Sequence, residues 1–328
     1  MPQGLAMHPA LLAATSPHGV LMRSHALEQG CADDDIRAAL RCGELRRIRA
    51  GTYAWSSAWD QLDVRGRHLL RVHGVALKSA TDVVVSHVSA LVLHGGPGWD
   101  LSLDQVHVTR PDRRGGRRTA GVVQHRGLLG RADVVAIDGL EVTSATRTAL
   151  DMLALVDVEH ALPVLDDFLH RKLTTPAELD ECRRRMDSWP GTLTADLAIR
   201  LADGRRESVG ESRAAYCFYL GGVPRPTPQW SVVDARGSEI ARLDFAWPEH
   251  GVWVEFDGKE KYLKHRRPGE SVVDAVLREK RREERIAGLT GWRCIRIIWA
   301  DLFHPEALAA YVVGVLRGGP VHTSRRSA

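Results

Sequence analysis

Two neighbouring apolar segments contain carboxylates, although segments of this kind rarely contain charged residues. They are residues 242–247 (RLDFAW) and residues 252–259 (VWVEFDGK). Val, Leu, Phe and Trp favour strands, and burying an unpaired charge among them costs free energy. Residues two apart in a strand share a face, so we expect Glu255 and Asp257 to point the same way.

A hairpin through residues 248–251 (PEHG) would bring Asp244 to these two acids. Clustered carboxylates suit a hard cation such as Mg²⁺ or Mn²⁺, so the segments predict a metal-dependent reaction on phosphates. Two alternatives stay open. Asp257 precedes Gly258 and could only shape a turn, and Asp244 and Glu255 could form ion pairs on an exposed face.

Charge is unevenly distributed along the 328 residues. Residues 205–328 hold 21 Lys and Arg against 16 Asp and Glu, whereas residues 1–204 hold 24 against 25. The excess of basic residues accompanies the acidic segments and favours a polyanionic partner.

The five cysteines are scattered and include no Cys-x-x-Cys pair, which predicts neither a zinc site nor a disulfide framework. The N-terminus lacks the pattern of a signal peptide, and no run reaches the roughly 18 apolar residues that span a bilayer. We therefore expect a cytoplasmic protein that does not associate with membranes.

Residues 1–62 are predicted to form a winged-helix DNA-binding domain. Helices are expected over 8–14, 23–29 and 33–42, followed by a small hairpin over 45–48 and 52–55. The hairpin carries Arg46, Arg47 and Arg49, which either contact DNA or form a solvated basic face. The third helix begins with three aspartates, Asp33 to Asp35, which would repel phosphate and argue against base reading by that end.

Residues 63–204 are predicted to form a mixed α+β middle domain. Strands over 105–109 and 121–125 flank a loop of five arginines: Arg110, Arg113, Arg114, Arg117 and Arg118. The loop is either a solvated hairpin tip or a clamp on a nucleic-acid backbone. The histidines at 87, 94, 107 and 125 show no metal-ligand spacing, so each is interpreted as a packing or surface residue.

Residues 205–328 are predicted to form a third domain with the element order α-β-β-β-α-β-α. Its first helix, over 208–220, carries Glu211, and its strands are expected over 229–234, 239–246, 252–257 and 294–298. Trp230, Trp247, Trp253 and Trp292 are expected to build its core. The predicted fold class is therefore a multidomain α+β and α/β protein.

Residues 208–302 resemble the PD-(D/E)XK nucleases, in particular the branch that resembles very-short-patch-repair endonucleases. Asp244 matches the first strand acid of that family, Glu255 the second and Glu211 the helix acid. The resemblance implies a restriction-endonuclease-like core, Mg²⁺ or Mn²⁺ at Asp244 and Glu255, and hydrolysis of phosphodiester bonds.

The family lysine, two residues after the second acid, is absent from this sequence. Asp257 occupies its position, and Lys259, Lys261 and Lys280 are the candidates to replace it. Lys280 falls near the apolar stripe of Val273, Val276, Leu277 and Ala287 on its helix. It either faces the sheet or is a lysine that snorkels at the edge of that stripe.

Residues 19–54 and 80–155 resemble the antitoxins of AbiEi type from type IV toxin–antitoxin systems. That resemblance implies DNA-binding repression of an operon and a cognate toxin as partner. The leading hypothesis is a Mg²⁺-dependent endonuclease acting on double-stranded DNA. The alternative is an antitoxin-like transcriptional regulator with an inactive nuclease fold, and RNA as the target is a third possibility.

Overall fold

The chain is a mixed α/β protein with three sheets among its described residues. The computed structural model describes residues 9–79, 83–111, 118–119, 121–186, 192–258 and 271–321. The chain divides into two compact units: the first holds Met1–Val156 and Thr174–Thr192, and the second holds Asp157–Leu173 and Leu193–Ala328. No described helix is both long enough and apolar enough to cross a membrane.

The first unit begins with short helices around a three-stranded sheet of order β1-β3-β2. Its elements are α1 (Pro9–Ala13), β1 (Val20–Met22), α2 (Arg23–Glu28), α3 (Asp33–Arg41), β2 (Leu45–Arg49), β3 (Thr52–Trp55) and α4 (Ser56–Gln61). The hairpin and the three expected helices are present, and β1 is an additional strand that pairs antiparallel with β3. A core that includes Leu21, Ile36 and Trp55 joins the helices to this sheet because their apolar faces are removed from water there.

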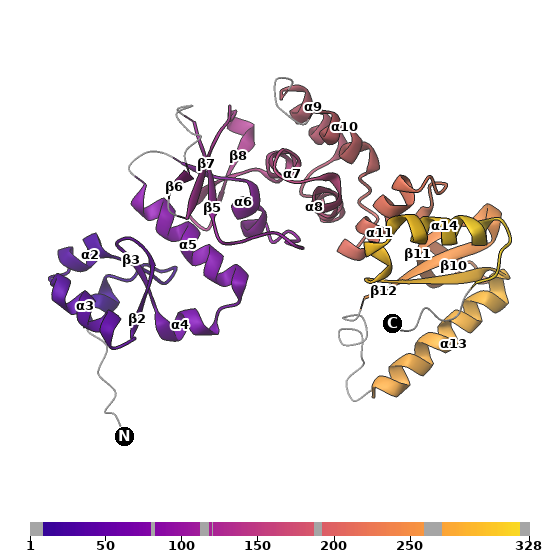
Figure 1. Cartoon of the computed structure of the whole chain (residues 1–328), viewed down its shortest axis with the longest axis horizontal. Coiled ribbons are helices and arrows are strands. Elements are labelled where there is room, and N and C mark those ends of the chain that lie inside the picture. The colour runs from indigo at the N-terminus through magenta and orange to yellow at the C-terminus, as the bar shows by residue number, and fades with distance from the viewer. Residues whose placement is uncertain are drawn as a thin grey trace. The chain divides into compact units, whose positions relative to one another are not determined.

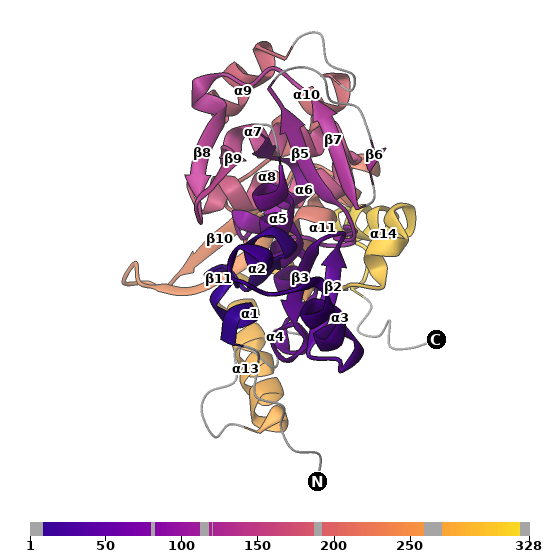
Figure 2. The ribbon, with the colours of Figure 1, turned by 90° about the vertical axis from the view of Figure 1, so that its left-hand side faces the viewer.

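A six-stranded sheet of order β6-β7-β5-β4-β9-β8 follows, and Figure 2 shows its strands fanned from β8 to β6. Its strands are β4 (Val84–Val85), β5 (Val106–Arg110), β6 (Arg118–Thr119), β7 (Val122–Arg126), β8 (Val134–Ile137) and β9 (Leu140–Thr143). The helices of this part are α5 (Val64–Lys78), α6 (His87–Leu93), α7 (Ala145–Leu153) and α9 (Pro176–Arg184), with a short 3-10 turn η1 (Arg131–Asp133).

The arginine-rich loop does not join the two arms of a hairpin. Strands β5 and β7 run parallel, with Val106 opposite Val122 and Arg110 opposite Arg126. The strand that pairs antiparallel with β7 is β6, which includes Arg118. The hairpin-tip interpretation of residues 110–118 is therefore wrong, because parallel neighbours need a crossover connection instead of a turn.

The second unit contains the predicted order α-β-β-β-α-β-α. These elements are α11 (Val209–Leu220), β10 (Thr227–Val233), β11 (Glu239–Trp247), β12 (Val252–Asp257), α13 (Val272–Thr290), β13 (Arg293–Ile298) and α14 (Pro305–Leu316). The unit also contains α8 (Val158–His170), α10 (Thr192–Leu201) and the 3-10 turns η2 (Pro248–His250) and η3 (Asp301–Phe303). The strands pair in the order β10-β11-β12-β13, the first three antiparallel and the last pair parallel.

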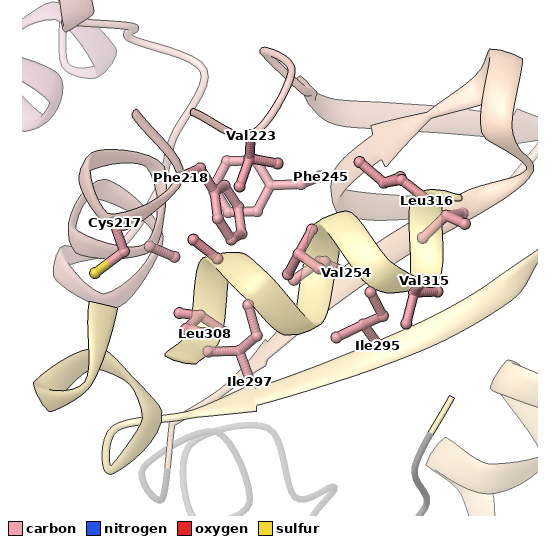
Figure 3. Packing of buried hydrophobic residues seen from close by; sticks show 14 of the residues in the cluster. Cys217, Phe218, Val223, Phe245, Val254, Ile295, Ile297, Leu308, Val315 and Leu316 are labelled. Carbon is pink, nitrogen blue, oxygen red and sulfur yellow. The ribbon is translucent and has the colours of Figure 1, made fainter. Parts of the chain in front are cut away.

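Both faces of this four-stranded sheet are covered, as Figure 1 shows with α14 and α13 on opposite sides of the strands. On one face, side chains of α11 and α14 pack on Phe245, Val254 and Ile295 (Figure 3). On the other face, Ile286 of α13 packs with Trp253 and Leu243. The alternation of residues along β12 explains this division, since Val252, Val254 and Phe256 belong to the first core and Trp253 to the second.

The four tryptophans named from the sequence belong to the apolar cores of this unit, as predicted. Trp247 and Trp253 are fully buried, and Trp230 and Trp292 are partly buried against the core on the α13 side. Helix α8 begins this unit ahead of residue 205, and two ion pairs attach it: Arg206 to Asp166 and Arg213 to Glu159.

Candidate functional site

The two strand acids lie where β11 and β12 stop pairing with each other. The antiparallel ladder runs from Trp247 opposite Val252 to Phe245 opposite Val254. One residue beyond it, the Phe256 N–H donates to Asp244 Oδ2 at 2.7 Å, so a carboxylate takes the place of a strand carbonyl. Asp244 is 7% exposed and Glu255 5% exposed. We call this place, where β11 and β12 separate beside Asp244 and Glu255, the fork. It therefore holds two carboxylates in an environment that excludes most water.

Glu211 enters the same neighbourhood from the start of α11. Its backbone N–H donates to the Ser208 hydroxyl oxygen, and its side chain accepts hydrogen bonds from the Ser208 hydroxyl at 2.7 Å and the Glu207 N–H at 3.1 Å. Ser208 is thus the N-cap of α11, and the bonds from Ser208 and Glu207 together fix the direction of the Glu211 side chain. Burial raises the pKa of Glu211, and the negative charge of Asp244 raises it further. The two carboxylates are thus close enough to repel each other, and a cation would relieve that repulsion.

Gln229 also belongs to the site, although its sequence context did not predict this. Its Nε2 donates to Glu211 Oε2 at 2.9 Å. The β10–β11 register pairs Pro228 with Phe245 and Trp230 with Leu243, so Gln229 and Asp244 both fall between these two pairs. Its φ of 52° lies in the left-handed region, which costs a non-glycine residue free energy and often accompanies functional sites. A glutamine within a strand gives no sequence signal of this geometry.

Glu255 lies beside an arginine of α13. Arg282 Nη1 and Nη2 both lie 3.4 Å from Glu255 Oε1, while Nη1 donates to Glu279 at 2.8 Å and Nη2 donates to the Arg242 carbonyl at 2.8 Å. Burial lowers the pKa of Arg282, but the carboxylates of Glu255, Glu279 and Asp244 outweigh it and raise the pKa above its usual value. The guanidinium therefore stays charged at the rim of the fork.

Asp257 shares the α13 face with Glu255, as expected from their spacing. Arg296 Nη1 donates to Asp257 Oδ2 at 2.8 Å, and its Nη2 donates to Glu283 of α13 at 2.7 Å. Burial lowers the pKa of Arg296, but hydrogen bonds and the charges of Glu283 and Asp257 outweigh it and raise the pKa. Asp257 is thus one acid of an ion network between β12, β13 and α13.

Of the three lysines that could replace the family lysine, the structure describes only Lys280. Lys259 and Lys261 lie outside the described residues. Lys280 is exposed on α13, so the prediction that it faces the sheet is wrong. Of the stripe that suggested it, Val273 and Leu277 are exposed, whereas Ala287 packs beside the buried Ile286.

The donor chemistry of the fork fits a hard divalent cation, because carboxylate oxygens are the ligands that Mg²⁺ prefers. Within the described ranges, however, no group of three His, Cys, Asp or Glu side chains is already arranged to hold a metal ion. Arg282 supplies positive charge beside Glu255 in this arrangement.

The three arginines of the β2–β3 hairpin differ in their exposure to solvent. Arg46 and Arg47 are exposed and Arg49 is partly buried. Arg46 also contacts Asp60 at 3.3 Å.

Asp33 lies at the start of α3 and pairs with Arg23 of α2 at 2.6 Å, so it ties the two helices together.

The arginine-rich loop is described only at its ends. Arg113, Arg114 and Arg117 lie outside the described residues, and Arg118 begins β6.

Three histidines that the sequence left apart come together in the first unit. The rings of His87 and His125 stack at 3.5 Å, and His107 Nδ1 lies 2.9 Å from His125 Nε2. His87 has a φ of 51° at the start of α6, and burial is the main cause that lowers its pKa. These three described histidines do not form a group arranged to hold a metal ion.

Comparison with known proteins finds relatives without an assigned activity. No family model matches the chain. The chain is 29% identical over 208 residues to "Uncharacterized protein Rv2248" and to "Uncharacterized protein MT2308" of two Mycobacterium tuberculosis strains, covering 63% of this chain and 72% of each relative. A crystal structure of RV2827C protein from Mycobacterium tuberculosis has a TM-score of 0.38 and 16% identity, covering 66% of this chain and 83% of that one.

Proposed function

We propose that the second unit is a divalent-metal-dependent DNA endonuclease of PD-(D/E)XK type. The observation that carries the proposal is the place of Asp244 at the fork between β11 and β12. Its carboxylate accepts the N–H of Phe256, the residue after the buried Glu255, and its charge, together with burial, raises the pKa of Glu211. Buried acids with a raised pKa are typical of functional sites.

Each residue of the fork has a role in this proposal. Asp244 and Glu255 would hold Mg²⁺ or Mn²⁺, and that ion would offset charge on the phosphate and lower the pKa of the attacking water. Glu211, oriented by Ser208 and Gln229, would accept a proton from the water or hold it in position. The lysine role falls to Lys259 or Lys261, which follow β12 in the sequence.

DNA recruitment is assigned to the first unit. Helices α2 and α3 with the β2–β3 hairpin support a winged-helix interpretation, and Arg46 and Arg47 are exposed on the hairpin. Exposed arginines neutralise phosphates and release counterions, so this surface provides affinity without reading sequence.

Cleavage of supercoiled plasmid tests the nuclease proposal directly. The full chain is incubated with Mg²⁺, Mn²⁺ or EDTA, beside Asp244→Asn and the control Glu249→Gln, an exposed acid of η2 between the same strands. We expect metal-dependent nicking that Asp244→Asn lowers by at least about a hundredfold and Glu249→Gln leaves unchanged. Equal nicking by wild type and Asp244→Asn would remove the proposed site.

A second function is favoured by the cationic side chains beside the acids. Arg282 contacts Glu255, and Asp257 with its partner Arg296 stands where the family lysine would be. These pairs support a regulator that keeps the nuclease fold without cleavage and represses its own operon as an antitoxin of AbiEi type does. Its cognate toxin would then be a second partner.

Binding to promoter fragments tests the regulator. We expect salt-sensitive binding without hydrolysis, which Arg47→Ala weakens while reducing the salt slope by about one, and which Arg236→Ala in an exposed turn of the second unit leaves unchanged. Equal affinity for promoter and unrelated fragments would contradict sequence-specific repression.

A further inference from the structure

Arg282 is the one fork residue whose contacts join β11, β12 and α13 at once, among the contacts described. Its guanidinium donates to the Arg242 carbonyl of β11 and to Glu279 of its own helix, and it lies 3.4 Å from Glu255 of β12. The side chain is 31% exposed and that of Glu255 7% exposed, so the pair is shielded from most water. A shielded ion pair interacts more strongly than a surface pair and is screened less by salt.

We propose that Arg282 is an internal counter-cation that competes with a divalent metal ion for Glu255. This inference rests on the proposed nuclease site and adds its regulation: metal enters as the guanidinium leaves the carboxylate. Both guanidinium nitrogens lie against Glu255 Oε1, and two positive charges at short range repel each other, so the guanidinium weakens the binding of a metal ion to this carboxylate. The metal concentration that is needed to occupy the site then depends on Arg282 of α13.

The guanidinium has other partners that do not depend on Glu255. Glu279 lies one helical turn earlier on α13 and accepts from Arg282 at 2.8 Å, and the Arg242 carbonyl accepts at 2.8 Å. Both of these bonds are shorter than the 3.4 Å separation from Glu255. Arg282 can therefore move away from Glu255 without losing all of its partners, which makes exchange with a metal ion energetically accessible.

The test measures the affinity of the full chain for Mn²⁺. The electron paramagnetic resonance signal of unbound Mn²⁺ gives the amount of free ion at each total concentration, and neither DNA nor an activity assay is needed. The variants are Arg282→Gln and the matched control Arg285→Gln, which removes the same charge from an exposed position of α13. We expect Arg282→Gln to bind Mn²⁺ roughly tenfold more tightly than wild type, because a charge-assisted contact no longer competes. Arg285→Gln should match wild type within about twofold.

The single variant Glu255→Gln and the double variant Arg282→Gln/Glu255→Gln separate this inference from the nuclease proposal. Tighter binding that disappears in the double variant supports competition at Glu255. If wild type and Arg282→Gln bind Mn²⁺ equally and both depend on Glu255, Arg282 does not compete, although the metal site stands. If neither binds Mn²⁺, the competition and the proposed metal-dependent function are both overturned.

Discussion

At the scale of single residues, the fork depends on side chains that the backbone holds in costly positions. Gln229 adopts a positive φ within β10, and Glu211, Asp244 and Glu255 are all at most 7% exposed. Strained backbone and buried acids both lower the stability of a fold, and both are typical of sites that act on a ligand. The residue that connects these features is Gln229, through its bond to Glu211.

Two substitutions of Gln229 separate its backbone role from its side-chain role. Gln229→Gly should keep the free energy of unfolding within about 1 kcal/mol of wild type, since glycine adopts positive φ without strain. Gln229→Val should lower it by about 1–3 kcal/mol, because a β-branched residue is disfavoured there. Urea denaturation measures both values. Equal stability of the two variants would show that the positive φ is not required in solution.

The same variants report on function. Both lose the hydrogen bond to Glu211, so plasmid nicking should fall in both, by about tenfold for a lost orienting contact. Full activity in Gln229→Gly would mean that Ser208 and Glu207 orient Glu211 by themselves.

At the scale of elements, the site depends on how closely α11 approaches β12. A Cβ atom at Gly210 would lie 2.0 Å from a ring carbon of Phe256, which is closer than atoms can pack. Gly210 directly precedes Glu211, and Phe256 donates its N–H to Asp244. One close contact between a helix and a strand therefore determines the separation of two acids that the sequence places 33 positions apart.

Gly210→Ala should therefore impair both folding and the site. We expect the free energy of unfolding to fall by about 1–3 kcal/mol, because α11 must shift or Phe256 must leave its rotamer. Gly288→Ala in α13 is the control, since nothing lies within 4 Å of its added Cβ, and it should raise stability by up to about 1 kcal/mol through helix propensity. Thermal denaturation compares the two, and equal stability of both variants would contradict the close packing.

At the scale of the whole molecule, the two units should respond to acid in opposite directions. In the first unit, burial lowers the pKa of His68, His73 and His87, and that of His73 falls to about 4. In the second unit, burial raises the pKa of Glu211 and of Asp166, and that of Asp166 reaches about 6. Each shift is a difference in proton binding between folded and unfolded states.

The sign follows from which state binds the proton first. Below their ordinary pKa of 6.5 the unfolded histidines take up protons while the folded ones do not, so the first unit loses stability as pH falls from about 6.5 towards 4. Buried Asp151, whose pKa is raised to about 6, offsets part of that loss. Folded Asp166 keeps its proton between its ordinary pKa of 3.8 and about 6, so the second unit gains stability over the same fall in pH.

Scanning calorimetry at pH 7 and pH 5 measures this difference. We expect two transitions that move in opposite directions, with the second unit's transition identified by Phe218→Ala, which should destabilise that unit alone by about 3–5 kcal/mol. Two transitions that shift together would contradict the assignment of these groups.

What the sequence determined about this chain is its local order. The apolar alternation of 252–257 fixed a strand with Glu255 and Asp257 on one face, and turn residues 248–251 fixed the hairpin that brings β11 to β12. These features depend on neighbouring residues and on the periods of helix and strand, which can be followed along one chain. The order α-β-β-β-α-β-α was predictable for the same reason.

Only the tertiary structure decided which distant residues meet. The parallel pairing of β5 with β7, the stacked rings of His87 and His125, the Gln229–Glu211 bond and the place of Arg282 beside Glu255 have no local signal. The outward direction of Lys280 was decided in the same way, by Ile286 and Ala287 packing under α13. Each of these contacts joins segments far apart in the chain, and close packing of whole elements selects among the many pairings that local patterns allow.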